Sequence, residues 1–358
     1  MPTSADHPSP SAVEPPARSA AEGLGERISF EELVALIEGR LRAAGACEPV
    51  ARELALNCAS CERDGTLSHG VFRVRGYVDS LGRGWADGCA EPEVERAGGA
   101  FVRVDGRNGF SQPALAAARE EIAEAVREAG AAVVAIRDAH HFSALWPELE
   151  SFARSGLVAL GMIAGGKAAV IPPGARQRVF GTNPFGFATP AADADPVVFD
   201  FATSTMSHGD LQLHRNEGRS VPPGTGVDGD GEDCMDPAVI LAEGGLSPFG
   251  GHKGALLSLM IETLAAGLTG AGFTVEIDAE APAGAHTFRT GQLYIVIDPK
   301  RGSGDGFPGR VAELVGMLRE AGMSRMPGDR RYARRRRAEV EGIPVTDDIR
   351  ALRGEVSG

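Results

Sequence analysis

Lysine is scarce in this sequence. Of its 36 basic residues only Lys167, Lys253 and Lys300 are lysines, and all the others are arginines. Because arginine takes nearly every cationic role, a retained lysine can mark a place where a compact point charge is needed. Codon bias would give the same composition, so the three positions serve only as pointers to candidate sites.

Long hydrophobic runs are also missing. No apolar stretch reaches the roughly 18 residues needed to cross a bilayer, and there is no signal-peptide core. The net charge of −13 argues against a nucleic-acid phosphate backbone or an anionic membrane surface as partner. We therefore expect a soluble cytoplasmic protein with no nucleic-acid partner and no membrane partner.

Cysteine is too scarce for a disulfide framework, since the 358 residues include five cysteines, an odd number. Cys58 and Cys61 form a C-x-x-C pair, a spacing typical of thiol-redox and zinc sites. However, the surrounding stretch has helical spacing, and no second pair of cysteine or histidine ligands follows. We interpret the two residues as buried thiols on one face of a helix.

The patterns that are present predict two packed lobes after a tail. Residues 1–25 are rich in proline, serine and alanine and are expected to be disordered. Residues 26–97 are expected to form a helical domain, which starts at an S-x-x-E capping box of Ser29 and Glu32. Residues 98–298 are expected to form an α/β domain, and residues 299–358 return to helix and are expected to pack back on the helical domain.

Short β-branched or apolar runs alternate with helical patterns in the α/β part. The predicted strands are 100–106, 131–139, 157–165, 179–190, 196–203 and 292–298. The predicted helices are 113–129, 147–155 and 254–268. No G-x-G-x-x-G follows a strand, so the Rossmann fingerprint for a dinucleotide is absent.

The stretch "DGTLSHGVFRVRGYVDS" places Ser68, His69 and Arg73 at the head of a predicted amphipathic helix. A solvated helix needs none of these residues, and a core helix disfavours a histidine beside an arginine. A histidine near a guanidinium suits proton donation to a substrate whose carboxylate the arginine holds, with a phosphorylated cofactor supplying the electrons.

Other polar residues lie at element ends, each with two interpretations. His252 and Lys253 open a helix after three glycines, where they would bind an anion or remain solvated. His140 and His141 follow a strand, and each would contact a ligand or bond to backbone. With Asp138 nearby a metal is conceivable, but the third ligand is missing, so we predict no metal site.

Strand ends and the chain terminus offer further candidates. Polar groups gather at the ends of two neighbouring strands: Thr182, Asn183, Asp200, Thr203 and Ser204. Asp210 would orient a histidine or be a solvated residue at a helix start. The arginine-rich segment 330–337 would be a solvated face or a set of phosphate contacts.

Several long motifs, in order, resemble the type-2 malate/L-lactate dehydrogenase family: "SHGVFRVRGY", "HHFSALWPE", "RVFGTNPFGFATP", "VVFDFATS", "GGHKGALLSLMIETLAAGLTG" and "MPGDRRYARR". The resemblance implies an α/β fold with a mixed sheet and a non-Rossmann domain that binds the nicotinamide cofactor. It also implies a homodimer. Within the family the motifs are most similar to the Δ1-piperideine-2-carboxylate/Δ1-pyrroline-2-carboxylate reductases. These enzymes use NADPH to reduce cyclic ketimines to L-pipecolate and L-proline.

The resemblance also implies roles for single residues. His69 would be the proton donor and Ser68 part of its relay, with Asp210 as the relay carboxylate and Asp200 as the competing candidate. Arg73 would bind the substrate carboxylate, and Thr182 would touch the substrate. The stretches that match cofactor contacts contain His141, Phe142, Ser143, Ala144, Leu145, Asp200, Phe201, Ala202, His252, Lys253, Gly328, Asp329, Arg330 and Arg331.

Two positions depart from the family motifs. Ser143 stands where much of the family has glycine, and Lys167 is unexpected in a loop that would border the substrate. The leading prediction is therefore an NADPH-dependent ketimine reductase, with NADH as the alternative cofactor. The alternative function is an NAD(P)-dependent dehydrogenase of a 2-hydroxy or 2-oxo acid such as malate or lactate.

Overall fold

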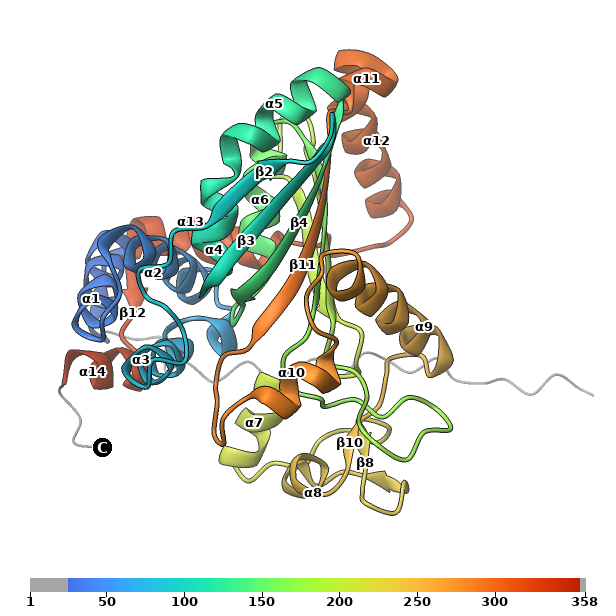
Figure 1. Ribbon diagram of the computed structural model, residues 1–358. Coiled ribbons are helices and arrows are strands. Elements are labelled where there is room, and N and C mark those ends of the chain that lie inside the picture. The colour runs from blue at the N-terminus through green and yellow to red at the C-terminus, as the bar shows by residue number, and fades with distance from the viewer. Residues whose placement is uncertain (1–24, 355–358) are drawn as a thin grey trace, which may run out of the picture.

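A seven-stranded mixed sheet forms the centre of the computed structural model, which describes residues 25–354 (Figure 1). The predicted tail therefore lies almost wholly outside the described residues. In sheet order the strands are β2 (Glu93–Arg96), β3 (Phe101–Phe110), β4 (Ala131–His140), β11 (Arg289–Ile297), β5 (Val158–Ala164), β6 (Pro184–Thr189) and β7 (Val197–Ala202). Only β3 and β4 are parallel neighbours. The predicted α/β class with a mixed sheet is confirmed.

Helices cover both faces of this sheet. On one face lie α4 (Ser111–Ala117), α5 (Arg119–Ala129) and α6 (Trp146–Arg154), whose apolar residues share a core with β3, β4 and β11. On the other face lie α9 (His252–Ile261) and its π-helical continuation over residues 262–267. Among the described residues no helix is long and apolar enough to span a membrane.

Three of the predicted elements are divided, altered or shortened in the structure. The helix predicted over 113–129 is two helices that meet at Ala118, and the one predicted over 254–268 changes to a π-helix after Ile261. The strand predicted over 179–190 begins only at Pro184, because Asn183 has a positive φ of 38° that turns the chain there. Local apolar pattern alone does not reveal such a turn.

A helical layer lies beside one end of the sheet. It contains α1 (Phe30–Ala43), α2 (Glu48–Arg63), α3 (Val74–Gly82) and α14 (Asp347–Arg353), which share one apolar core. The capping box of Ser29 and Glu32 is confirmed, with both of its hydrogen bonds formed. The start of the described chain also pairs with its end, since β1 (Arg27–Ile28) is antiparallel to β12 (Ile343–Pro344).

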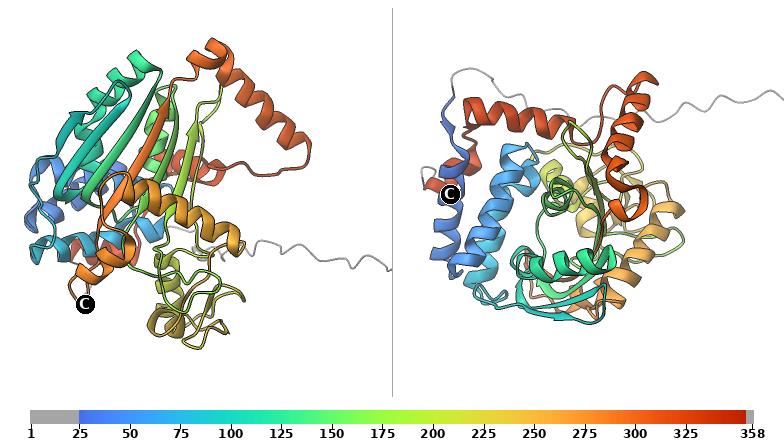
Figure 2. Two further views of the ribbon diagram at one scale, coloured as in Figure 1. Left: turned by 45° about the vertical axis from the view of Figure 1, so that its right-hand side comes forward. Right: turned by 90° about the horizontal axis from the view of Figure 1, so that it is seen from above.

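The C-terminal segment packs back on the helical layer only in part. From above, α13 (Asp329–Glu341) lies across the end of α2 (Figure 2), and Arg335 forms ion pairs with Asp64 and Glu150. By contrast, α11 (Lys300–Ser303) and α12 (Phe307–Glu320) lie on the far side of the sheet from α1 (Figure 1). The domain boundaries drawn from the sequence remain predictions.

A small unit below the sheet was not predicted from the sequence. It consists of α7 (His208–Asn216), α8 (Pro237–Ala242) and a three-stranded sheet of β10 (Gly245–Leu246), β8 (Gly226–Val227) and β9 (Asp233–Cys234) (Figure 1). The short α10 (Thr274–Glu280) lies between this unit and the main sheet. Strands of two residues carry no periodicity, so the sequence contains no signal for them.

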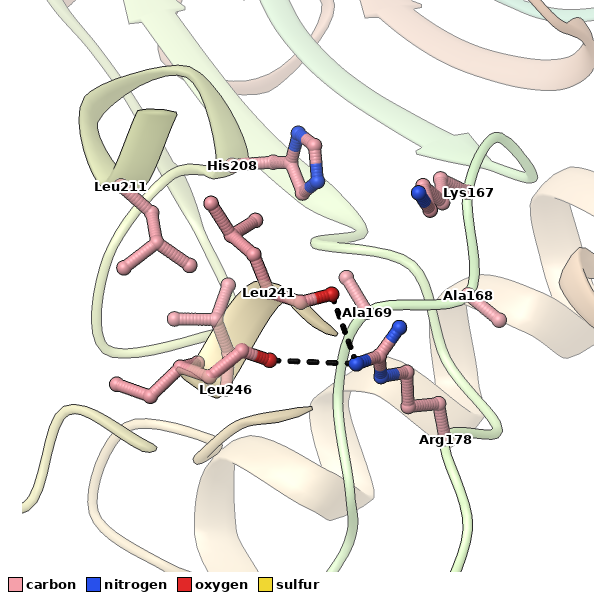
Figure 3. Close-up of a pocket in the computed structure, with 9 residues that line it drawn as sticks. Lys167, Ala168, Ala169, Arg178, His208, Leu211, Leu241 and Leu246 are labelled. Atoms are coloured by element: carbon pink, nitrogen blue, oxygen red, sulfur yellow. Dashed lines mark hydrogen bonds between the residues drawn. The ribbon is translucent and has the colours of Figure 1, made fainter. Parts of the chain in front are cut away.

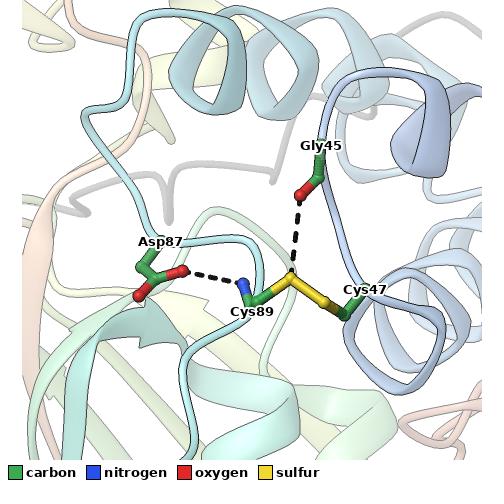
Figure 4. Close-up of a disulfide and its surroundings, with 4 residues drawn as sticks. All are labelled: Gly45, Cys47, Asp87 and Cys89. Carbon is green, nitrogen blue, oxygen red and sulfur yellow. Dashed lines mark hydrogen bonds between the residues drawn. A yellow bond between two sulfur atoms is a disulfide. The ribbon is translucent and has the colours of Figure 1, made fainter.

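One disulfide joins Cys47, before α2, to Cys89, in the segment that follows α3 (Figure 4). The sequence analysis did not predict this bond, because the two residues are 42 positions apart and no spacing rule connects them. Cys58 and Cys61 are free, and both are buried on α2, as expected. The loop that the disulfide closes contains Ser68, His69 and Arg73.

Replacing both Cys47 and Cys89 by serine is expected to destabilise the protein. In the chain-entropy model, a disulfide that closes a loop of this length stabilises the folded state by about 4 kcal/mol. The free energy of unfolding of the double variant should fall by at most this amount. Thermal or denaturant unfolding measures the effect, with Cys234→Ser as the matched control because Cys234 is free and half-exposed. An unchanged unfolding midpoint in the double variant would contradict a stabilising role for the bond.

Candidate active site

The predicted helix that begins with Ser68 and His69 is broken in the structure. Residues 67–69 and 71–73 form two 3₁₀ turns, and α3 starts only at Val74. The break lies at Gly70, where a Cβ would come within 2.2 Å of Glu62 Oε2. That carboxylate accepts a hydrogen bond from the Val71 N–H at 2.9 Å. The prediction of one continuous helix is therefore wrong, because α2 packs too closely on this glycine.

The two turns nevertheless bring the predicted catalytic residues together. Ser68 Oγ lies 3.0 Å from His69 Nδ1, and Arg73 Nε donates to the Ser68 carbonyl at 2.7 Å. The Arg73 guanidinium is buried and lies 4.1 Å above the ring of Phe142. Because Nε and the flat face are occupied, the terminal nitrogens of Arg73 are the part left to bind a substrate carboxylate.

His69 is an uncharged imidazole at neutral pH. Its burial, the positive charge of Arg73 and the neighbouring His141 together hold its pKa well below the usual value of 6.5. Desolvation disfavours the imidazolium, and a nearby cation acts in the same direction. The imidazole of His69, beside the predicted carboxylate anchor Arg73, is thus a hydrogen-bonding base that gains a proton only under acidic conditions.

The two candidate relay aspartates occupy different places. Asp200, on β7, accepts hydrogen bonds from the N–H groups of Leu145 (2.9 Å) and Trp146 (3.3 Å), so it caps the start of α6. Asp210 lies in the first turn of α7, where its side chain accepts from Ser207 Oγ at 2.8 Å. Asp200 is therefore engaged elsewhere. Of the two, Asp210 remains the candidate for orienting His69.

Helix α7 packs directly against the catalytic turns. A Cβ placed on Gly209 would lie 2.7 Å from Arg73 Nη2, so only a glycine permits this approach. Burial lowers the pKa of Arg73, and the carboxylate of Asp210 acts in the opposite direction, as expected of a neighbouring anion. Within residues 25–354 no hydrogen bond joins Asp210 to His69, so the relay role of Asp210 stays a prediction.

The two histidines after β4 have different surroundings. His140 is fully buried, and its ring nitrogens meet Asn108 Oδ1 at 3.1 Å and Thr287 Oγ1 at 3.0 Å. Burial lowers its pKa to about 3, so it is a neutral core residue. His141 Nε2 lies 3.0 Å from Glu148 Oε1. Only His141 therefore remains a candidate for ligand contact.

Glu148 was not singled out from the sequence, although it joins four elements. Its carboxylate is buried and accepts from Gln112 Nε2 at 2.8 Å and from the Tyr294 hydroxyl, besides contacting His141. A buried carboxylate needs such partners, because leaving it without them would be costly. The only signal in the sequence was a glutamate in the first turn of a predicted helix, which is too common to carry a prediction.

The segments predicted to contact the cofactor converge around the end of β7. Asp200 holds the N-terminus of α6 and thus the stretch 141–145, and Arg331 Nη2 donates to the Val198 carbonyl at 2.6 Å. Thr203 N and Oγ1 both donate to the carbonyl of Thr182. The N–H of Phe249, just before His252 and Lys253, donates to the Thr203 carbonyl. These stretches, which are far apart in the sequence, therefore lie together along β7, at one edge of the sheet.

The start of α9 presents two of the side chains that were predicted to bind the cofactor. His252 and Lys253 are exposed, and neither side chain has a hydrogen-bond or ion-pair partner in the described part of the chain. Gly250 and Gly251 have positive φ angles, and the N–H groups of Gly251, Lys253 and Gly254 donate to the carbonyls of Pro248, Gly250 and Phe249. Phe201, 41% exposed, packs edge-on against Phe249 at 5.7 Å and offers an apolar face near the start of this helix.

Most of the arginines in segment 330–337 serve packing within the protein. Arg335 pairs with Asp64 and Glu150, Arg336 with Asp195, and Arg331 lies 4.7 Å above the Trp146 ring. Arg330, in contrast, is exposed and has no described partner. The phosphate-binding interpretation is thus limited to Arg330. In residues 25–354 no three histidine, cysteine or carboxylate side chains cluster as metal ligands.

Comparison with known proteins now adds to this geometry. The family model for malate/L-lactate dehydrogenase matches residues 28–353, nearly all of the described chain. The chain belongs to this family. As a member of the malate/L-lactate dehydrogenase family it is an NAD(P)H-dependent oxidoreductase, as the sequence motifs predicted.

Individual relatives are similar over almost their whole length. A Δ1-pyrroline-2-carboxylate/Δ1-piperideine-2-carboxylate reductase of Pseudomonas putida is 52% identical over 321 residues, which cover 90% of this chain and 94% of the relative. The reductase of the same name from Pseudomonas syringae pv. tomato is 50% identical over 341 residues, covering 95% and 99% of the two chains.

The crystal structure of a Δ1-piperideine-2-carboxylate reductase from Pseudomonas syringae superimposes with a TM-score of 0.89, covering 92% of this chain and 100% of that one. A putative malate/lactate dehydrogenase of E. coli, 26% identical, has a TM-score of 0.84 and covers 93% of this chain and 96% of its own. The fold is therefore shared with both kinds of family member.

Proposed function

We propose that the protein reduces a cyclic ketimine carboxylate, Δ1-piperideine-2-carboxylate or Δ1-pyrroline-2-carboxylate, to L-pipecolate or L-proline with NADPH. The names of the relatives at 52% and 50% identity support the substrate class. The family motifs in the sequence point to the same class.

The position of Ser68 and His69 beside the buried Arg73 is the observation that carries the proposal. A 2-oxo acid must receive a proton on its oxygen as it is reduced, so it needs a general acid at that position. A cyclic imine near neutral pH already carries its proton on nitrogen. The pKa of His69 is well below its usual range. Its imidazole is therefore better suited to accept a hydrogen bond from the iminium N–H than to donate a proton to a ketone.

The other residues bind and orient the substrate. Arg73 would hold the carboxylate through its two terminal nitrogens, and Phe142 would keep that guanidinium in place. Ser68 would align the His69 ring, and Thr182 would touch the substrate from the segment just before β6. A reduced nicotinamide bound on the non-Rossmann sheet near Phe201 would supply the hydride. His252, Lys253 and Arg330 would hold the phosphates of the cofactor.

A single assay tests the proposal. Purified protein with NADPH is followed at the absorbance band of the reduced nicotinamide, across a panel of cyclic imino acids and 2-oxo acids. We expect the two ketimines to have the highest kcat/KM. Higher kcat/KM for pyruvate or oxaloacetate would favour the alternative, an NAD(P)-dependent dehydrogenase of a 2-hydroxy acid.

NADPH preference is assigned to Arg330, the arginine of its segment that has no described partner. Arg330→Ser should raise the KM for NADPH about tenfold and change the KM for NADH little, because only NADPH carries the additional phosphate. The matched control is Arg336→Ser on the same helix, because Arg336 pairs with Asp195. Equal changes for both cofactors would show that Arg330 belongs to a solvated face.

We also propose a homodimer that forms through the exposed apolar side of α9 and α12. Leu314 and Met317 on α12 are 55% and 58% exposed, and no residue of α12 is buried in the described chain. Leu256 and Leu259 on α9 are exposed as well, and both helices lie on one side of the molecule (Figure 1). Apolar surface of this extent usually marks an interface. Molar mass by light scattering tests it.

A further inference from the structure

A buried glutamate lies where α9 changes into its π-helical continuation. Glu262 is the first residue of the π-helix over residues 262–267, and it is 6% exposed. Short π-helical segments inside α-helices are rare and are often found at functional sites. Burying a carboxylate is costly unless hydrogen-bond donors surround it, so its partners show which parts of the fold it holds.

Three hydrogen-bond donors surround the Glu262 carboxylate. Asn183 Nδ2 donates to Oε1 at 2.8 Å, and Thr274 N donates to Oε2 at 3.1 Å. The Thr274 hydroxyl donates to Oε1 as well. Thr274 Oγ1 in turn accepts from the N–H groups of Gly165 (3.2 Å) and Gly181 (3.3 Å). Glu262 therefore joins three segments: the start of α10, the loop after β5 and the residues just before β6.

Two of these segments pair with each other beyond Thr274. From β5 the chain passes through Lys167, which lines the small cavity in Figure 3, to Val170. Val170 forms an antiparallel bridge with Phe180 in the segment before β6. Thr274 closes the end of this pair that lies nearest the main sheet, so Glu262 acts where both segments leave the sheet.

Asn183 depends on Glu262 for its conformation. It is 1% exposed, and its backbone has a positive φ of 38°, which asparagine tolerates better than most residues do. Its Nδ2 donates to Glu262 and, at 3.4 Å, to the Ser258 carbonyl, whereas its Oδ1 has no hydrogen-bond partner within residues 25–354. The opposite orientation of the amide would direct its oxygen at two acceptors. Glu262 thus holds the side chain of the residue whose backbone turn precedes β6.

The turn at Asn183 sets the direction of the preceding residue, Thr182. The Thr182 carbonyl accepts from Thr203 N at 2.9 Å and from Thr203 Oγ1 at 3.1 Å. By contrast, the Thr182 hydroxyl has no hydrogen-bond partner in the part of the chain that the structure describes. The backbone of Thr182 is therefore fixed, while its side chain remains available to a ligand.

We propose that Glu262 is a positioning residue: through Asn183 it holds the Thr182 hydroxyl toward the carboxylate of the substrate. The inference rests on the proposed function. A cyclic ketimine has only two polar groups, its nitrogen and its carboxylate, and His69 accepts the N–H. The Thr182 hydroxyl therefore donates to the carboxylate, beside the guanidinium of Arg73. Glu262 itself touches neither the substrate nor the cofactor.

Replacing Glu262 by methionine, which has a similar length but accepts no such hydrogen bonds, tests the proposal. The KM for Δ1-piperideine-2-carboxylate should rise about tenfold, because a hydrogen bond to a charged group is lost. The Kd for NADPH, measured by titration of its fluorescence, should stay nearly the same. Thr182→Val should raise the same KM by a similar factor. Because Glu262 acts through Thr182, the double variant should be little worse than either single variant, whereas independent effects would multiply.

Glu150→Met is the matched control, since Glu150 is also a buried helix glutamate but pairs with Arg154 and Arg335. It should lower the unfolding midpoint and leave the KM unchanged. Asn183→Gly tests the same link if Glu262→Met does not fold. Glycine keeps the positive φ but removes the amide, so this variant should reproduce the rise in KM.

The methyl group of Thr182 gives a measurement that needs no substrate. In the NMR spectrum of protein labelled at its threonine methyl groups, the Thr182 signal is the one that Thr182→Val removes. Glu262→Met should shift this signal, and Glu150→Met should not. An unmoved signal, or independent effects of Glu262→Met and Thr182→Val on KM, overturns the proposal. If neither ketimine is reduced, the proposed function fails, and the methyl signal still decides whether Glu262 positions Thr182.

Discussion

Replacing Arg73 by methionine is expected to lower kcat/KM for the ketimine by about 10²–10⁴-fold, corresponding to about 3–5 kcal/mol. The guanidinium is buried, so a substrate carboxylate bound without it would lie desolvated and unpaired. Most of the loss should appear in KM, because the carboxylate is present in both the bound substrate and the transition state.

Two further variants sharpen this prediction. Arg73→Lys keeps the charge but loses the planar fork, and should fall between the wild-type protein and Arg73→Met. Arg75→Met is the control, because Arg75 is the next arginine on the same segment and is exposed. If Arg73→Met folds normally and its KM is unchanged, the carboxylate is bound elsewhere.

Replacing His69 by alanine is expected to separate the two classes of acceptor. Reduction of a 2-oxo acid should fall by about 10²–10⁴-fold, the usual range for loss of a general acid. Reduction of a cyclic ketimine should fall less, about tenfold, because the iminium nitrogen brings its own proton. His286→Ala serves as the control, since His286 is exposed. Equal losses on both acceptors would contradict this division of roles.

The direction in which the reduction rate changes with pH follows from the protonation of His69. The pKa of His69 is well below 6.5, so the protonated imidazole becomes more abundant as the pH falls through and below that value. The rate of 2-oxo acid reduction by the unaltered protein should therefore keep rising below pH 6.5, whereas ketimine reduction should follow the pKa of the substrate. In His69→Ala the rise on the 2-oxo acid should disappear.

Local patterns predicted the parts of the structure that depend on local physics. The capping box at Ser29 needs only residues within one turn, and the burial of Cys58 and Cys61 follows from helical spacing. Six of the seven strands of the sheet were predicted from short apolar and β-branched runs, whereas β2 was missed; the mixed sheet was expected from the family resemblance. The pairing of His69 with Arg73 was also readable, because both lie within five residues of each other.

Features that depend on distant contacts were not readable. The helix expected at Ser68 is broken at Gly70, whose backbone is not helical and which packs on Glu62 of another helix, and Asp200 caps the start of α6. The arginines at the chain end appeared suited to phosphate until Arg335 was seen to pair with Asp64 and Glu150. In each case the partner is supplied by a segment remote in the sequence.

By itself, then, the sequence determined the chemical types at the site: an imidazole, a guanidinium and a hydroxyl in one short segment, with retained lysines elsewhere. Only the tertiary structure decided their electrostatic state and their neighbours. Burial next to Arg73 keeps His69 neutral, and the packing of α7 brings Gly209 against the carboxylate anchor. The physical reason is that burial and charge proximity are properties of the folded chain, which no stretch of sequence contains alone.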